Sequence, residues 1–123
     1  MADTECRILI VEDDTDARDA LAAALGDAGF AVEKAGTGKQ ALARAAGGLP
    51  IDVLLVDMHL PDLSGSELLE KFRDLPGTMK ARAIVLTGDT RLRMLDLTQQ
   101  AKLLHKPFGL EELEVAVKEA CAA

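Results

Sequence analysis

The chain has 123 residues, of which 49% are hydrophobic, so it is long enough for one compact domain with its own core and too short for a second. A formal net charge of −7 and the lack of Trp and Tyr argue against direct nucleic-acid binding, which relies on basic side chains and stacking aromatic rings. No apolar run reaches the length of a membrane span, and the first residues lack the pattern of a signal peptide. We therefore expect a cytoplasmic protein without membrane insertion.

The two cysteines, Cys6 and Cys121, lie near opposite ends of the sequence. Their separation matches neither a Cys-x-x-Cys motif nor the spacing of metal ligands. We expect two reduced thiols that pack as small apolar groups.

Strand and helix patterns alternate five times along the chain, with short connections. We predict strands at 7–11, 30–34, 52–56, 83–86 and 102–105, and helices at 15–28, 37–46, 64–75, 90–100 and 110–122. Such an alternation requires right-handed crossovers and a parallel sheet covered on both faces. The sequence thus predicts a single flavodoxin-like (βα)5 α/β domain over 1–123, for which the strand order 2-1-3-4-5 is favoured.

Local signals mark several helix ends. Gly29 stands where the first helix stops, and Thr37 precedes the second as an N-cap. Ser64 and Glu67 have the spacing of a capping box, in which each side chain bonds the backbone N–H of the other residue.

Polar side chains follow four of the five predicted strands. Glu12 and Asp13 follow the first strand, Asp57 the third, Thr87 the fourth and Lys106 lies just beyond the fifth. The carboxyl ends of parallel strands share one edge of the sheet, where open α/β folds bind their ligands. We therefore expect three carboxylates, one ammonium and one hydroxyl to meet at this edge.

This combination suits a divalent cation and a phosphoryl group. Crowded carboxylates raise one another's pKa, and a hard cation such as Mg²⁺, or Mn²⁺ in its place, relieves that conflict. Asp57 is then placed as a nucleophile that carries an aspartyl phosphate. Lys106 and Thr87 supply a positive charge and a hydrogen bond for the phosphoryl oxygens.

The sequence resembles, over nearly its whole length, the receiver domain of bacterial two-component response regulators. The matching residues are Glu12-Asp13, Asp57 with the Pro61-to-Gly65 turn, Thr87-Gly88 and Lys106-Pro107-Phe108. The resemblance implies a signalling phosphoacceptor rather than an enzyme. Its aspartate, here Asp57, accepts a phosphoryl group from a histidine kinase's phosphohistidine, or from small phosphodonors with Mg²⁺, and loses it slowly.

The resemblance also implies a metal-ligand set. Asp13, Asp57 and the backbone carbonyl of His59 would bind the ion directly, and Glu12 would act through water. Thr87 would contact the phosphoryl group.

Further implied features concern the phosphoryl group and its lifetime. Lys106 would contact the phosphoryl oxygens, and the Lys106–Pro107 peptide bond would be cis. The side chains of His59 and Asp89 would border the path of the attacking water and tune the rate of dephosphorylation. A solvated His59 that contributes its carbonyl alone is an equal alternative.

The chain departs from the family pattern at two places. Leu103 stands where family members that signal through a rotating aromatic ring carry Tyr or Phe, which puts that relay in doubt. The segment from Thr87 to Lys106 is also a few residues shorter than usual.

Several matching stretches look like receivers fused to hybrid sensor histidine kinases, and a free-standing regulator is the other option. The expected partners are a histidine kinase or its transmitter domain and a histidine phosphotransfer protein. Homodimerisation is left open.

Three other functions compete with this interpretation. Gly36-Thr37-Gly38-Lys39-Gln40-Ala41 satisfies a dinucleotide-binding pattern, but it follows the second strand and leaves the acidic residues and Lys106 unexplained. An aspartate-nucleophile phosphatase would need an Asp where His59 stands. A pseudo-receiver that binds a partner without phosphorylation is disfavoured because Asp13, Asp57 and Lys106 are all present.

Overall fold

The computed structural model describes residues 6–48, 50–58, 60–75, 82–88 and 101–122. The strands are β1 (Arg7–Val11), β2 (Ala31–Ala35), β3 (Val53–Asp57), β4 (Arg82–Thr87) and β5 (Ala101–His105). The helices in these ranges are α1 (Thr15–Asp27), α2 (Gly38–Ala46), α3 (Gly65–Arg73) and α4 (Leu110–Ala122). The helix predicted at 90–100 lies outside the described residues.

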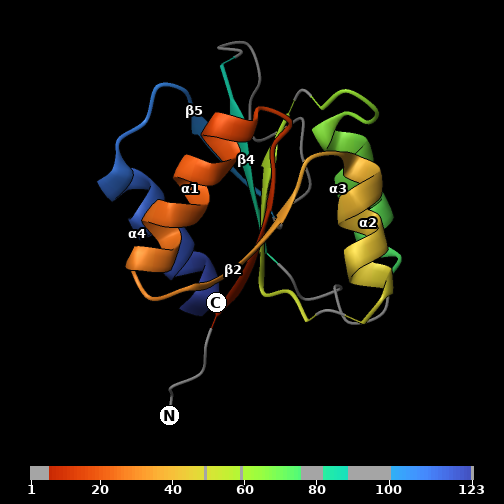
Figure 1. The fold of residues 1–123 in the computed structure, drawn as a ribbon, viewed down its shortest axis with the longest axis horizontal. Coiled ribbons are helices and arrows are strands. Elements are labelled where there is room, and N and C mark those ends of the chain that lie inside the picture. The colour runs from red at the N-terminus through yellow and green to blue at the C-terminus, as the bar shows by residue number, and fades with distance from the viewer. Residues whose placement is uncertain (1–5, 49, 59, 76–81, 89–100, 123) are drawn as a thin grey trace.

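The strands form one parallel sheet in the order β2-β1-β3-β4-β5, which confirms the predicted flavodoxin-like topology. Helices α1 and α4 cover one face of the sheet, and α2 and α3 cover the other (Figure 1). Within the described ranges, no helix combines the length and the apolar character that a bilayer crossing requires.

Alternate residues of each central strand supply the two halves of the core. In β1, Leu9 and Val11 pack toward α2 and α3, whereas Ile8 and Ile10 pack toward α1 and α4. All five residues of β3 are buried, as expected of a strand covered on both faces. Full burial of each such apolar side chain contributes about 1.5–3 kcal/mol, so the two layers hold the strand ends at fixed positions.

The predicted helix-end signals are present in the structure. Gly29 follows α1 with a φ of 102°, a left-handed conformation that glycine adopts without steric cost. The Thr37 side chain accepts a hydrogen bond from the Gln40 N–H at the start of α2. Ser64 and Glu67 form the reciprocal capping box at the start of α3, with both bonds 3.1 Å long.

β2, β3 and β4 each end one residue later than predicted. Asp57 is the last residue of β3 and pairs with Leu86, and Thr87 is the last residue of β4 and pairs with His105. The backbone hydrogen bonds of the sheet continue through Asp57 and Thr87. Sheet pairing therefore fixes the backbone of both residues.

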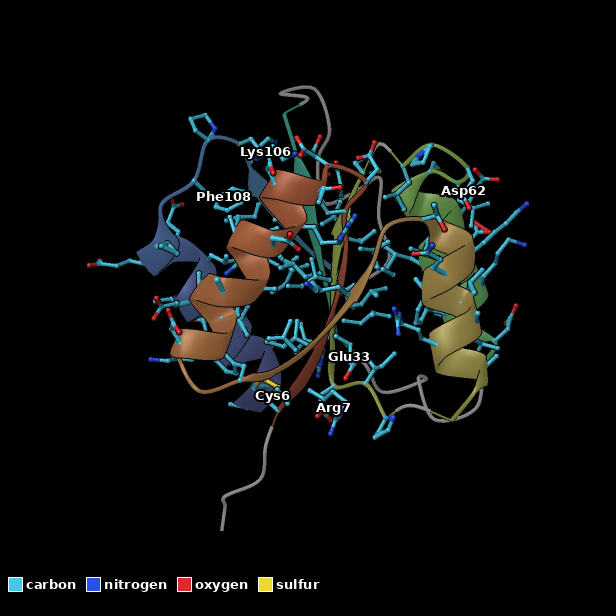
Figure 2. The ribbon with its side chains drawn as sticks, viewed as in Figure 1. Cys6, Arg7, Glu33, Asp62, Lys106 and Phe108 are labelled. Carbon is cyan, nitrogen blue, oxygen red and sulfur yellow. A yellow bond between two sulfur atoms is a disulfide. The ribbon has the colours of Figure 1, made fainter. Side chains whose placement is uncertain are left out.

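The expectation of two reduced thiols is wrong in this structure. Cys6 and Cys121 form a disulfide bond, with their Cα atoms 5.9 Å apart. Both side chains pack on the core layer beneath α1 and α4, and this packing brings the start of β1 and the end of α4 together. Sequence separation hid this proximity, because the two residues are 115 positions apart. In Figure 2 the sulfur atoms at Cys6 lie at the opposite end of the molecule from Lys106.

Candidate functional site

Strand register places the polar candidates at one edge of the sheet. Val11 of β1 pairs with Val56 of β3, so Glu12 and Asp57 follow at the same level. Two backbone bonds continue the pairing past the strands: the Met58 N–H donates to Leu86 and the Lys106 N–H donates to Thr87. Backbone pairing between the strands therefore holds Glu12, Asp57 and Lys106 at the same edge of the sheet.

Three carboxylates gather at this edge. One oxygen from each of Glu12, Asp13 and Asp57 lies within 4.8 Å of the others. Glu12 and Asp57 are 4% and 7% exposed, whereas Asp13 is exposed. Oxygen donors at this spacing fit a hard divalent cation, and the exposed Asp13 leaves a side open for ligands from solution.

The pKa of Glu12 is raised to about 7, mainly by burial and in part by the nearby charge of Asp57, while a hydrogen bond from the Asp14 N–H acts in the opposite direction. The amide of Asp14 lies 3.2 Å from the Glu12 carboxylate. Burial beside a second carboxylate therefore favours the protonated form of Glu12 near neutral pH.

A positive charge stands beside the same carboxylates. The Lys106 Nζ lies 3.8 Å from an Asp57 carboxylate oxygen. Lys106 is half exposed, whereas the Asp57 side chain is 10% exposed, so the ammonium reaches a buried carboxylate from the solvent side. The Lys106–Pro107 peptide bond is cis, the geometry that the family resemblance implies.

Thr87 completes the row on β4 and is fully buried. Its carbonyl accepts the Lys106 N–H at 2.7 Å, which ties the end of β4 to the residue that follows β5. Thr87 therefore lies at the same edge of the sheet as Asp57 and Lys106.

The loop after β1 is held by its own side chains. Asp14 caps α1, and its carboxylate accepts the N–H groups of Asp16 and Ala17 at 3.0 and 3.4 Å. The position of an Asp just before a predicted helix is a recognised N-cap signal, so this role could have been predicted from the sequence. The Arg18 guanidinium donates a hydrogen bond to the Glu12 carbonyl, and this contact has no such signal because it depends on the folded loop.

The glycine-rich segment before α2 has a structural partner. The Asp62 carboxylate accepts the N–H groups of Gly38 and Lys39 at 2.9 and 3.0 Å, and the Gly38 bond is the main cause of a lowered pKa for Asp62. A dinucleotide motif would use such helix-terminal N–H groups for phosphate. Here a side chain of the β3–α3 loop occupies them, which agrees with the rejection of a nucleotide-binding enzyme.

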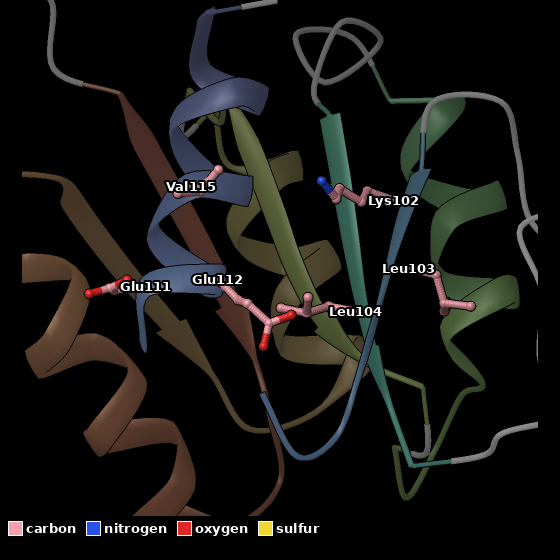
Figure 3. Close-up of a pocket in the computed structure, with 6 residues that line it drawn as sticks. All are labelled: Lys102, Leu103, Leu104, Glu111, Glu112 and Val115. Atoms are coloured by element: carbon pink, nitrogen blue, oxygen red, sulfur yellow. The ribbon is translucent and has the colours of Figure 1, made fainter. Parts of the chain in front are cut away.

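Of the three remaining candidates, the structure describes Leu103 but not His59 or Asp89. His59 and Asp89 lie outside the described residues, so the backbone ligand and the rate-tuning roles stay predictions. Leu103 is half-buried, and its side chain packs against the core layer of α2 and α3. Together with Lys102 and Leu104 it also lines a hollow beside α4 (Figure 3). The expectation that Leu103 disables an aromatic relay likewise stays a prediction.

Comparison with known proteins agrees with this fold. The family model described as response regulator receiver domain matches residues 8–118. The chain is 36% identical to an uncharacterised 14.6 kDa protein of Leptolyngbya boryana, over 94% of this chain and 90% of that protein. It is also 36% identical to the transcriptional regulatory protein KdpE of Mycobacterium tuberculosis, over 94% of this chain and 53% of KdpE. The chain thus spans about half the length of this regulator.

Solved structures give the same result. A CheY-like receiver domain protein of Methanospirillum hungatei has a TM-score of 0.85 at 32% identity, over 97% of this chain and 95% of that one. The chemotaxis response regulator CheY4 of Vibrio cholerae has a TM-score of 0.82 at 28% identity, over 95% of this chain and 99% of that one. The chain belongs to the response regulator receiver domain family. Members of this family are phosphoacceptors in two-component signalling.

Proposed function

We propose that this chain, over 1–123, is a receiver domain whose phosphoacceptor is Asp57. The observation that carries the proposal is the meeting of three carboxylate oxygens within 4.8 Å of one another, with the Lys106 ammonium 3.8 Å from Asp57. A structural salt bridge would need one acid, whereas a phosphoryl site needs a nucleophile, a cation site and a positive charge together.

In the proposed reaction, an Asp57 carboxylate oxygen attacks phosphorus. The new O–P bond forms as the N–P bond of the phosphohistidine breaks, and the imidazole leaves with the electron pair and takes up a proton. Lys106 and the Thr87 hydroxyl then hold the phosphoryl oxygens. Attack of water on the aspartyl phosphate later releases inorganic phosphate and returns the carboxylate.

The donor set fits Mg²⁺ or Mn²⁺. Asp13 and Asp57 would hold the ion directly together with the backbone carbonyl of residue 59, and Glu12 would hold one of its waters. The bound cation supplies charge neutralisation for the phosphoryl oxygens. The ionised carboxylate of Glu12 would accept hydrogen bonds from the metal-bound water.

The proposed donor is a histidine kinase or its transmitter domain, and a histidine phosphotransfer protein can take the group onward. A cytoplasmic location follows from such partners. The charge of −7 supports a protein partner rather than nucleic acid. Free-standing and hybrid-kinase arrangements both fit this role.

The proposal is tested by incubating the protein with acetyl phosphate and measuring its intact mass. We expect a gain of one phosphoryl group with Mg²⁺, no gain with EDTA, and no gain for Asp57→Asn. Asp52→Asn, on the loop before β3 and bonded to the Arg7 N–H at 2.8 Å, is the matched control and should label normally. A folded, Mg²⁺-loaded protein that takes up no phosphoryl group would instead be a phosphorylation-independent interaction module.

A further inference from the structure

Arg18 of α1 reaches back to the start of the acidic loop. Its Nη1 donates a 2.9 Å hydrogen bond to the backbone carbonyl of Glu12, and its Nη2 makes a longer 3.5 Å contact with the Thr15 hydroxyl. Glu12 follows the last residue of β1, and its own N–H donates to Ala35 of β2. Arg18 therefore bonds the first backbone carbonyl beyond the β1 strand, in the residue that begins the acidic pair.

The neighbouring strand leaves room for this side chain. Gly36 follows β2, and a Cβ at this position would lie 3.0 Å from Arg18 Nη1. Contacts this short force the neighbouring atom to move, and the tip of an arginine moves easily. The glycine thus gives space to the guanidinium, while the Gly36 N–H is held by Gln40 at 2.8 Å.

We propose that Arg18 is a positioning residue for the metal and phosphoryl site. Its hydrogen bond to the Glu12 carbonyl holds the Glu12–Asp13 backbone in the orientation that turns both carboxylates toward Asp57, and Gly36 admits it. This role rests on the proposed function, since it assumes a cation at the carboxylate cluster.

The sign of the effect separates positioning from simple electrostatics. The guanidinium carries a positive charge next to a cation site, so its removal should tighten metal binding if charge alone matters. If Arg18 orients the ligands, its removal weakens binding instead, because the loop must be ordered when the ion binds. The two accounts predict opposite changes in the dissociation constant.

The test measures Mn²⁺ binding to the whole chain from the loss of the free-ion electron paramagnetic resonance signal. We expect Arg18→Ala to raise the Mn²⁺ dissociation constant about tenfold, the lower end of the usual effect of residues that support metal ligands. Gly36→Ala keeps the charge and displaces the guanidinium, so it should weaken binding in the same direction. In the Arg18→Ala background, Gly36→Ala should add less than about a twofold change, because it acts through Arg18.

Arg44→Ala is the control for lost charge. Arg44 lies on α2, where its Nη1 is 4.0 Å from Glu33, and the substitution changes the net charge by the same amount. It should leave the Mn²⁺ dissociation constant unchanged or slightly lower it. Thermal melting in EDTA measures stability separately from metal affinity.

Each outcome decides between the accounts. An unchanged or tighter Mn²⁺ affinity in Arg18→Ala overturns the positioning role. The same holds if Arg18→Ala lowers the melting temperature in EDTA without weakening Mn²⁺ binding. The proposed function itself is overturned if the wild-type protein does not bind Mn²⁺. It is also overturned if the wild type and the Asp13→Asn variant have the same Mn²⁺ dissociation constant.

Discussion

At the scale of single residues, Glu12 shows how burial at this edge favours the neutral form of a carboxyl group. Its carboxyl is almost fully buried next to a second buried carboxylate, and burial is the main cause of its raised pKa. The folded protein therefore keeps a proton on Glu12 at a pH where the unfolded chain has released it. Protons and divalent cations compete for the same oxygens.

This competition predicts the pH dependence of stability. Between the ordinary pKa of 4.5 and the folded value of about 7, the folded state binds the extra proton, so the free energy of unfolding falls as pH rises through this window. Chemical denaturation at several pH values in EDTA measures it. The Glu12→Gln variant should lose this slope, and the wild type should lose most of it in Mg²⁺. An equal slope in Glu12→Gln would mean that another group titrates.

Asp13 gives a second test at the same scale. If the proposed site binds Mg²⁺, the ion binds the folded cluster far better than the unfolded chain and should raise the melting temperature. Asp13→Asn removes a charged oxygen ligand and should reduce this Mg²⁺-dependent shift. Asp19→Asn, which breaks an exposed 3.1 Å ion pair with Lys34 away from the cluster, should keep the full shift. A full shift in Asp13→Asn would remove Asp13 from the ligand set.

Residue type and strand ends sufficed to predict which side chains share this edge of the sheet. Asp57, Thr87 and Lys106 follow directly from the rule that ligands bind at the carboxyl edge of a parallel sheet. Arg18 was missed because its bond is made to a backbone carbonyl six residues away, in a loop whose shape is set by folding. Side chains that bind backbone atoms leave no spacing pattern.

At the scale of elements, the loop between β3 and α3 is hydrogen-bonded to the start of helix α2. The Asp62 carboxylate bonds the first N–H groups of α2, and Leu63 packs against the same turn. The loop that follows Asp57 is therefore joined to a neighbouring helix. The strand ends could be predicted to within one or two residues, but this loop contact could not, because its partners are more than 20 positions apart.

A pair of glycines tests this packing. A Cβ at Gly38 would lie 2.7 Å from Leu63 Cδ1, whereas a Cβ at Gly26 in α1 would meet nothing within 4 Å. We expect Gly38→Ala to destabilise the protein by about 1–3 kcal/mol through overpacking. Gly26→Ala should stabilise it by about 0.5–1 kcal/mol, because alanine is the better helix former. Urea denaturation measures both, and equal effects would contradict the close approach of the loop.

At the scale of the whole molecule, the disulfide between Cys6 and Cys121 joins the two ends of the described chain. It lies at the end of the domain opposite the site, so its main effect is on stability rather than on the carboxylates (Figure 2). Disulfides are rare in the reducing cytosol, so this bond stands against the proposed cytoplasmic location unless it forms under oxidising conditions. Composition could not reveal it, because contact between distant cysteines depends on the completed fold.

Reduction of this bond should lower the melting temperature. A crosslink that closes most of the chain restricts the unfolded state, and loss of such a bond typically costs about 2–5 kcal/mol. Wild type with and without dithiothreitol should therefore differ, whereas the Cys6→Ser variant should melt at the same temperature in both conditions. Two titratable thiols in the untreated, folded wild type would show that the bond does not form in solution.

We propose that the side chains at the carboxyl edge form one phosphoryl-accepting site centred on Asp57. The most direct measurement treats the protein with acetyl phosphate and Mg²⁺, reduces the acyl phosphate with borohydride, and maps the product by peptide mass spectrometry. We predict that residue 57 is converted to homoserine, that EDTA prevents it, and that Asp13→Asn lowers its yield. Conversion at another acidic residue, or at none in a protein that binds Mg²⁺, would contradict the account.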